Sequence, residues 1–102
     1  MIVNGIDYVV LSPQNKITYK RSFIGNAILS SPENACEFIK PIDTLGDEAV
    51  INPVLVAVWG DCFYAQKVKN AEIAGAKMLI LVLKSQMPLN HASVRELRKF
   101  SF

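Results

Sequence analysis

The sequence predicts a single domain over residues 1–102, of the mixed α/β or α+β class, built around a central βαβ unit. A chain of 102 residues has the length of one domain, and 51% of its residues are hydrophobic while 20% are charged, which supports a packed core. Two short apolar runs, residues 54–59 and 78–83, are typical of buried strands. Between them the apolar positions take the period of a helix.

The first third of the chain carries β-strand signals. Residues 6–11 are rich in apolar residues, residues 12–15 have turn composition, and residues 16–20 alternate polar and apolar side chains. This order predicts a hairpin with one face toward solvent. Residues 27–29 predict a short further strand, and residues 40–53, which combine prolines, a glycine and charges, predict a surface loop.

The βαβ unit is predicted from the second half of the chain. Its first strand ends where Gly60 interrupts the apolar run. The helix that follows is predicted because residues recur on one face at helical spacing, namely Tyr64, Val68, Ala71 and Gly75. Gly75 suits a left-handed C-cap. Since a helix joins two buried strands, we expect those strands to be parallel.

The C-terminal segment carries a helix signal. Residues 93–96 read Ser-Val-Arg-Glu, which is the spacing of a capping box. Arg98 and Lys99 suit the C-terminal end of such a helix. We therefore predict a short helix that begins near residue 93.

Charge and hydropathy exclude several classes of partner. The net charge is +2 and the basic residues are dispersed, so neither nucleic acid nor a membrane surface is expected as a partner. The longest apolar run, residues 78–83, is far shorter than the roughly 20 residues that cross a bilayer. The first residues lack the pattern of a signal peptide, which predicts either a cytosolic protein or an excised mature domain.

The two cysteines, Cys36 and Cys62, leave two interpretations open. They are either two buried thiols or one disulfide. A zinc site is not expected, because neither lies in a Cys-x-x-Cys pair and the single histidine, His91, is distant in sequence. Cys62 stands at a strand-to-helix turn, where a thiol can become a nucleophile. The sequence places no general base near Cys62, so a structural role for this cysteine is favoured.

The remaining candidates for chemistry favour structural roles as well. The turn at Gly60 matches no nucleotide-binding motif, so no cofactor is expected. Lys67 lies on the apolar side of the predicted helix, where we expect its stem to pack on the sheet and its ammonium to reach water. Trp59 and Tyr64 are expected as core or rim aromatics. The sequence therefore predicts no catalytic set and no metal.

Residues 54–82 resemble the central motif of protease-associated (PA) domains. That motif is an apolar strand, Arg-Gly-x-Cys-x-Phe-x-x-Lys, a helix ending Ala-Gly-Ala, and a second apolar strand. Here the corresponding stretch reads Trp-Gly-Asp-Cys-Phe-Tyr-Ala-Gln-Lys over residues 59–67, and Ala-Gly-Ala occupies residues 74–76. The positions that correspond to the motif are Gly60, Cys62, Tyr64, Lys67, Ala71 and Gly75. Upstream, residues 28–36 look like the family's strand leading into an Ala-Cys turn.

The sequence departs from the family pattern in two places. Trp59 stands where the family has arginine. The tail after Leu83 lacks the family's last strand and following helix in recognisable form. The resemblance therefore predicts that these elements are cut off or supplied by another chain.

The resemblance implies a fold and a role. The fold is a β-sandwich or open barrel flanked by short helices, and the implied disulfide joins Cys36 to Cys62. The implied role is non-catalytic recognition of a protein or peptide within a larger secretory-pathway or extracellular protein, such as a protease, a sorting receptor, a transmembrane ubiquitin ligase or a lumenal glycosidase-like protein. Two alternatives stay open: a small cytosolic redox or thiol enzyme that uses Cys62, and a structural subunit of a lumenal assembly.

Partner contacts are expected from the loop at residues 40–53 and from residues 86–102. Both combine irregular sequence with exposed charge or surplus apolar side chains. The candidate contact residues are Asp43, Asp47, Glu48, Trp59, Met87, Phe100 and Phe102. The competing interpretation is that Phe100 and Phe102 fold back on the sheet and take the place of a strand.

Overall fold

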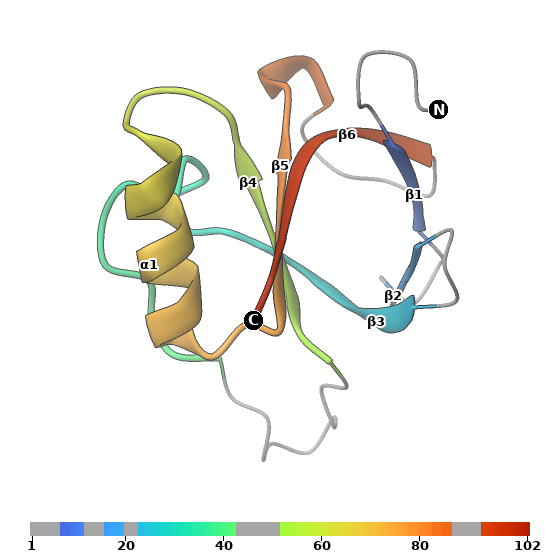
Figure 1. The fold of residues 1–102 in the computed structure, drawn as a ribbon, viewed down its shortest axis with the longest axis horizontal. Helices are drawn as coiled ribbons and strands as arrows, with labels where there is room; N and C mark the ends of the chain where they lie inside the picture. The colour runs from blue at the N-terminus through green and yellow to red at the C-terminus, as the bar shows by residue number, and fades with distance from the viewer. Residues whose placement is uncertain (1–6, 12–15, 20–22, 43–51, 87–92) are drawn as a thin grey trace.

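The computed structural model describes residues 7–11, 16–19, 23–42, 52–86 and 93–102. Within these ranges eight elements follow one another, and one of them, α1, is an α-helix (Figure 1). They are β1 (Asp7–Leu11), β2 (Lys16–Tyr19), β3 (Phe23–Leu29), β4 (Val54–Val58), α1 (Tyr64–Ala74), β5 (Met78–Val82), the 3-10 turn η2 (Lys84–Gln86) and β6 (Ser93–Ser101). No helix in the described ranges is long and apolar enough to cross a membrane.

The six strands form a closed barrel in the order β1-β2-β3-β4-β5-β6. β3 pairs with β4 and β4 pairs with β5 in parallel, while the other neighbours are antiparallel. The predicted hairpin and βαβ unit are thus confirmed. The strand predicted at residues 27–29 is longer, because it begins at Phe23. The resemblance implies a β-sandwich or an open barrel, whereas the strands form a closed barrel with α1 beside it.

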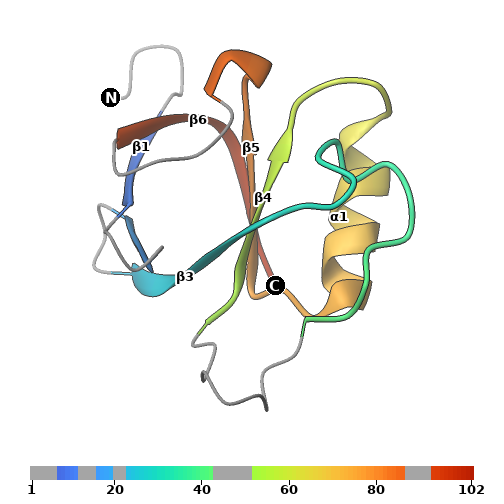
Figure 2. The same cartoon turned by 180° about the vertical axis from the view of Figure 1, so that it is seen from behind.

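The barrel closes because β3 and β6 each change partner along their length. β3 pairs with β2 through residues 23–26 and with β4 through residues 27–29. β6 pairs with β1 through residues 93–96 and with β5 through residues 96–101. Both strands cross the molecule from the side of β1 and β2 toward α1 (Figures 1 and 2).

The short helix predicted from residue 93 is wrong, because this segment is β6. Val94 and Glu96 are buried while Arg95 between them is exposed, which is the alternation of a strand. β6 pairs its backbone with both β1 and β5. This pairing satisfies many more backbone groups than the few that a capping box at residues 93–96 would satisfy. Phe100 consequently packs, half-buried, against the core beneath α1, as the competing interpretation expects.

The continuous apolar runs of β4 and β5 are buried on both faces. One set of side chains fills the barrel, and the alternate set packs under α1. The barrel set is Val9, Leu11, Ile17, Val54, Val56, Met78, Ile80, Val82 and Val94. The helix-facing set is Ala35, Ile39, Leu55, Ala57, Ala71, Ala74, Ala76, Leu79 and Leu81. Alanines at the contact let α1 lie close to the sheet.

Gly75 adopts the positive φ that the sequence predicts, 96°, and Gly60 also has a positive φ, 109°. No atom lies within 4 Å of a Cβ built on either residue, so backbone conformation is the constraint rather than space. At the end of α1 the Gly75 N–H donates to the Glu72 carbonyl at 3.1 Å, and the Ala76 N–H donates to the Ala71 carbonyl at 3.1 Å. This left-handed C-cap satisfies the last carbonyls of the helix.

Replacing Gly75 with alanine is expected to lower the free energy of unfolding by about 1 kcal/mol, because alanine resists the left-handed region. Gly75→Asn is the matched control, since asparagine tolerates that region better. Urea denaturation measures both variants. Equal stability of the alanine variant and the parent protein would contradict the backbone argument.

Candidate functional site

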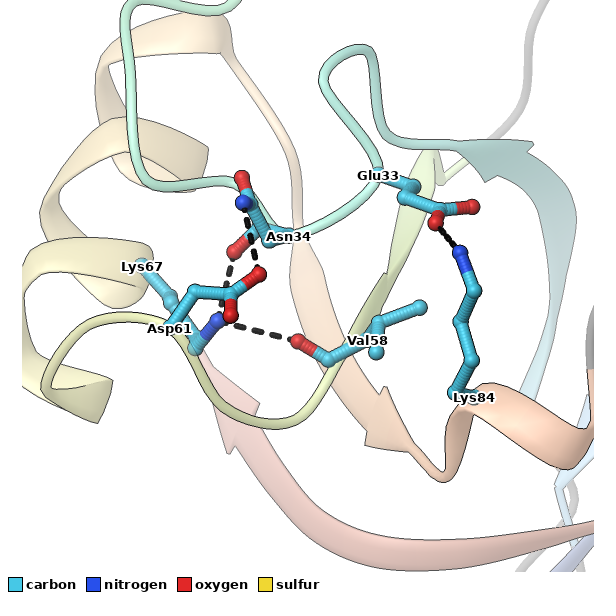
Figure 3. A network of polar contacts seen from close by, with 6 residues as sticks. All are labelled: Glu33, Asn34, Val58, Asp61, Lys67 and Lys84. Atoms are coloured by element: carbon cyan, nitrogen blue, oxygen red, sulfur yellow. Dashed lines mark hydrogen bonds and ion pairs between the residues drawn. The ribbon is translucent and has the colours of Figure 1, made fainter.

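Lys67 on α1 is 1% exposed, the largest of the fully buried side chains in the described part of the chain. Its ammonium donates hydrogen bonds to three backbone carbonyls, those of Asn34 at 2.6 Å, Gly60 at 2.6 Å and Val58 at 2.9 Å. Figure 3 shows the ammonium directed at Asn34 and at Val58, the last residue of β4. We call this arrangement of one ammonium and three carbonyls the lysine clasp. The expectation that Lys67 reaches water is therefore wrong.

The clasp depends on unusual backbone in two loops. Ala35, Gly60 and Asp61 all have positive φ, at 55°, 109° and 70°. Sharp turns of this kind let carbonyls of each loop face inward toward a single buried donor. Asn70, also on α1, donates from Nδ2 to the Ala35 carbonyl at 2.9 Å. In the sequence Gly60 marks the end of a strand, but nothing indicates positive φ at Ala35 or Asp61.

The disulfide joins the same two loops. Cys36 pairs with Cys62, and their Cα atoms are 5.9 Å apart. The pairing that the resemblance implies is confirmed, and the interpretation as two free thiols is wrong. The Lys67 Nζ lies 3.8 Å from the Cys36 Sγ, so the disulfide and the clasp form one cross-link.

Two opposing effects act on the pKa of Lys67 in the clasp. Burial lowers the pKa of Lys67, and the nearby Asp61 carboxylate acts in the opposite direction and raises it. Asp61 is held in place because the Asn34 Nδ2 donates to its Oδ2 at 3.0 Å (Figure 3). The Asn34 Oδ1 in turn accepts from the backbone N–H of Cys36 at 3.0 Å. The loop that supplies a carbonyl thus also positions the counter-charge.

Further contacts fasten the segment at residues 30–42 to the barrel. The Val58 N–H donates to the Glu33 carbonyl at 2.7 Å, and the Glu33 carboxylate forms an exposed ion pair with Lys84 (Figure 3). At its far end the Ile42 N–H donates to the Ala74 carbonyl at 2.9 Å. The segment contains no helix or strand, but it is bonded to the rest of the structure at residues 33–36 and again at Ile42.

A mostly apolar pocket of about 300 Å³ lies beside this fastened segment. Its walls come from the end of β3, from residues 39–42 and from Leu55 of β4. The lining residues are Ile28, Leu29, Ser31, Ile39, Lys40, Pro41, Ile42 and Leu55. Such an open, apolar concavity with few polar groups is typical of a binding site.

Of the residues predicted to contact a partner, Trp59, Phe100 and Phe102 are described, and none of these three lines the pocket. Asp43, Asp47, Glu48 and Met87 lie outside the described residues. Trp59 follows β4 and Phe102 follows β6, each a little under half exposed. Phe100 stacks on Tyr64 of α1 with ring centroids 5.6 Å apart, and the Arg98 guanidinium lies 5.0 Å from the Tyr64 ring centroid.

Sequence reasoning missed the pocket because its walls are distant in the chain. Of the lining residues, Lys40, Pro41 and Ile42 fall in the predicted loop at residues 40–53, which is the one signal that pointed toward this region. Ile28 and Leu29 read only as strand residues. No group of three or more His, Cys, Asp or Glu side chains that could hold a metal occurs in the described ranges.

Comparison of the chain with protein-family models, curated proteins and solved structures finds no match in any of the three. The lysine clasp and the pocket are therefore the features of the molecule that bear on its function.

Proposed function

We propose that this chain is a non-catalytic recognition module of the PA type, which binds a protein or peptide ligand as part of a larger protein. The observation that carries the proposal is the apolar pocket beside β3. Its irregular wall, residues 39–42, is bonded to α1 through Ile42 and follows directly on the segment that the lysine clasp and the disulfide fasten. A wall that is ordered before binding loses little entropy when a ligand arrives, which favours recognition. Irregular segments on a rigid barrel commonly carry binding.

The disulfide supports the compartment that we propose. Disulfides persist in the secretory pathway and outside the cell, where the surroundings are oxidising. The alternative of a thiol enzyme has weaker support, because the Cys62 sulfur is bonded to Cys36 and offers no thiolate to attack a substrate. Titration of thiols in the unfolded, unreduced protein is expected to find none.

Peptide selection tests the recognition role. The full chain, with its disulfide intact, is used to select from a phage-displayed random dodecapeptide library, and enriched peptides are synthesised. We expect saturable binding, and we expect it to shift the methyl NMR signals of Ile28, Ile42 and Leu55 in the pocket. Scrambled versions of the same peptides are the control and should bind at least about tenfold more weakly.

Two outcomes would overturn the proposal. The first is a library from which no peptide is enriched over the scrambled controls. The second is binding that leaves all three methyl signals unchanged, because recognition would then use another surface of the chain.

A further inference from the structure

The end of β3 has an open edge. β4 pairs with residues 27–29, but the pairing of β2 with β3 reaches only to Asn26. Among the described residues, no strand lies along the other side of residues 27–29. In Figure 2 this part of β3 extends past the end of its pairing with β2 and continues toward α1. An unpaired edge inside an otherwise closed barrel is a place where another chain can add a strand.

One hydrogen bond shows which side of β3 the backbone N–H and C=O groups of each residue face. The Ser30 N–H donates to the Val56 carbonyl at 2.9 Å, so the backbone groups of Ser30 face β4. Successive residues of a strand direct these groups to opposite sides, so those of Leu29 and Ala27 face away from β4. The open edge therefore presents the N–H and C=O of two alternate residues, which is the spacing that a paired strand uses.

The open edge and the apolar pocket coincide. Ile28 and Leu29 belong to both, and Leu55 of β4 contributes a fully buried side chain to the pocket. A strand laid along this edge directs alternate side chains to the same face. One of those side chains would reach the pocket and fill its apolar volume.

The charge at the rim of the pocket favours a ligand that carries an acidic residue. Lys40 lines the pocket and is exposed, and no acidic side chain in the described ranges forms an ion pair with it. The pocket lining itself contains no acidic residue. A carboxylate on an incoming segment would therefore meet an available ammonium at the rim.

We propose that the ligand is an extended peptide segment that pairs with the open edge of β3 as an added strand, places one apolar side chain in the pocket and directs an acidic residue to Lys40. The inference rests on the proposed function and states how the ligand binds. Backbone hydrogen bonds supply affinity in this mode, and the pocket together with Lys40 supplies specificity.

The test uses a peptide from the dodecapeptide selection and amide hydrogen exchange measured by NMR. When the peptide is bound, exchange at the amides of Leu29 and Ala27 is expected to slow by about tenfold or more, because each is then hydrogen-bonded. N-methylation of single peptide amides is expected to abolish binding at every second position and to be tolerated between them. This alternation is the signature of strand pairing.

Two pairs of variants test the side-chain contacts. Leu29→Asp is expected to weaken binding by about tenfold, while Ile24→Asp, an exposed position on the same strand, leaves it unchanged. Lys40→Glu is expected to weaken binding by about fivefold, while Lys69→Glu on α1 has no effect. Thermal denaturation of each variant confirms that the fold is intact.

The outcomes separate this inference from the proposed function. A peptide that binds without slowing exchange at Leu29, or whose N-methylation shows no alternation, overturns strand addition but leaves recognition standing. A library that yields no peptide overturns both. Self-association of the chain through β3, detected as dimerisation that Leu29→Asp abolishes, would make a second copy the occupant and also overturn the inference.

Discussion

Replacing Lys67 with methionine is expected to lower the free energy of unfolding by about 4 kcal/mol. Methionine keeps much of the apolar stem but removes the donor to the carbonyls of Asn34, Val58 and Gly60. A buried acceptor left without a partner costs about 1–3 kcal/mol. Here three acceptors lose the same donor, and the bond to Val58 is buried while those to Asn34 and Gly60 are partly buried. Urea denaturation with the disulfide intact measures the loss.

Lys69→Met is the matched control, because Lys69 is exposed on the same helix. Its effect should stay within about 0.5 kcal/mol. Lys67→Arg is not expected to restore stability, since a planar guanidinium cannot direct its donors at three convergent carbonyls as a compact ammonium does. A methionine variant as stable as the parent would show that the clasp does not hold the loops.

The same side chain gives the unfolding free energy a dependence on pH. Burial lowers the pKa of Lys67 below its usual value of 10.5 in the folded chain. Between the lowered pKa and 10.5 the unfolded chain binds more protons than the folded chain, so the stability of the parent protein rises with pH in that window. The stability gap between the parent and Lys67→Met is therefore expected to widen as the pH increases. A stability gap that narrows with increasing pH would show that the pKa of Lys67 is not lowered in the folded chain.

Removing the disulfide is expected to cost about 3 kcal/mol, as estimated from the entropy of closing a loop. Cys36 and Cys62 are separated by 26 residues, so the cross-link restricts a substantial part of the unfolded chain. The double variant Cys36→Ala/Cys62→Ala removes it without leaving a thiol. Its unfolding free energy is compared with that of the parent protein before and after reduction.

Reduction of the parent protein is expected to produce a loss similar to that of the double variant. Because the disulfide and the lysine clasp join the same two loops, the losses from Lys67→Met and the double cysteine variant should not be additive. Additive losses would show that the two cross-links stabilise the loops independently. A double variant as stable as the parent would contradict the entropic argument.

Local sequence patterns determined a large part of this fold. The apolar runs at residues 54–59 and 78–83 correspond to β4 and β5, and they are continuous because each strand is buried on both faces. Gly75 ends α1 as predicted, because the left-handed region strongly favours glycine. These features follow from interactions between near neighbours in the chain, which a sequence displays directly.

Other features were decided by tertiary structure alone. Residues 93–101 carry a local helix signal but form β6, because β1 and β5 each offer an unpaired edge that the segment completes. Lys67 looked like a residue that reaches solvent, yet its ammonium is bonded both to Asn34, 33 residues away in the sequence, and to Val58 at the end of β4. The pocket likewise joins β3 to residues 39–42 and Leu55. Backbone carbonyls and free strand edges have no residue-type signature, so only the folded chain shows where they meet.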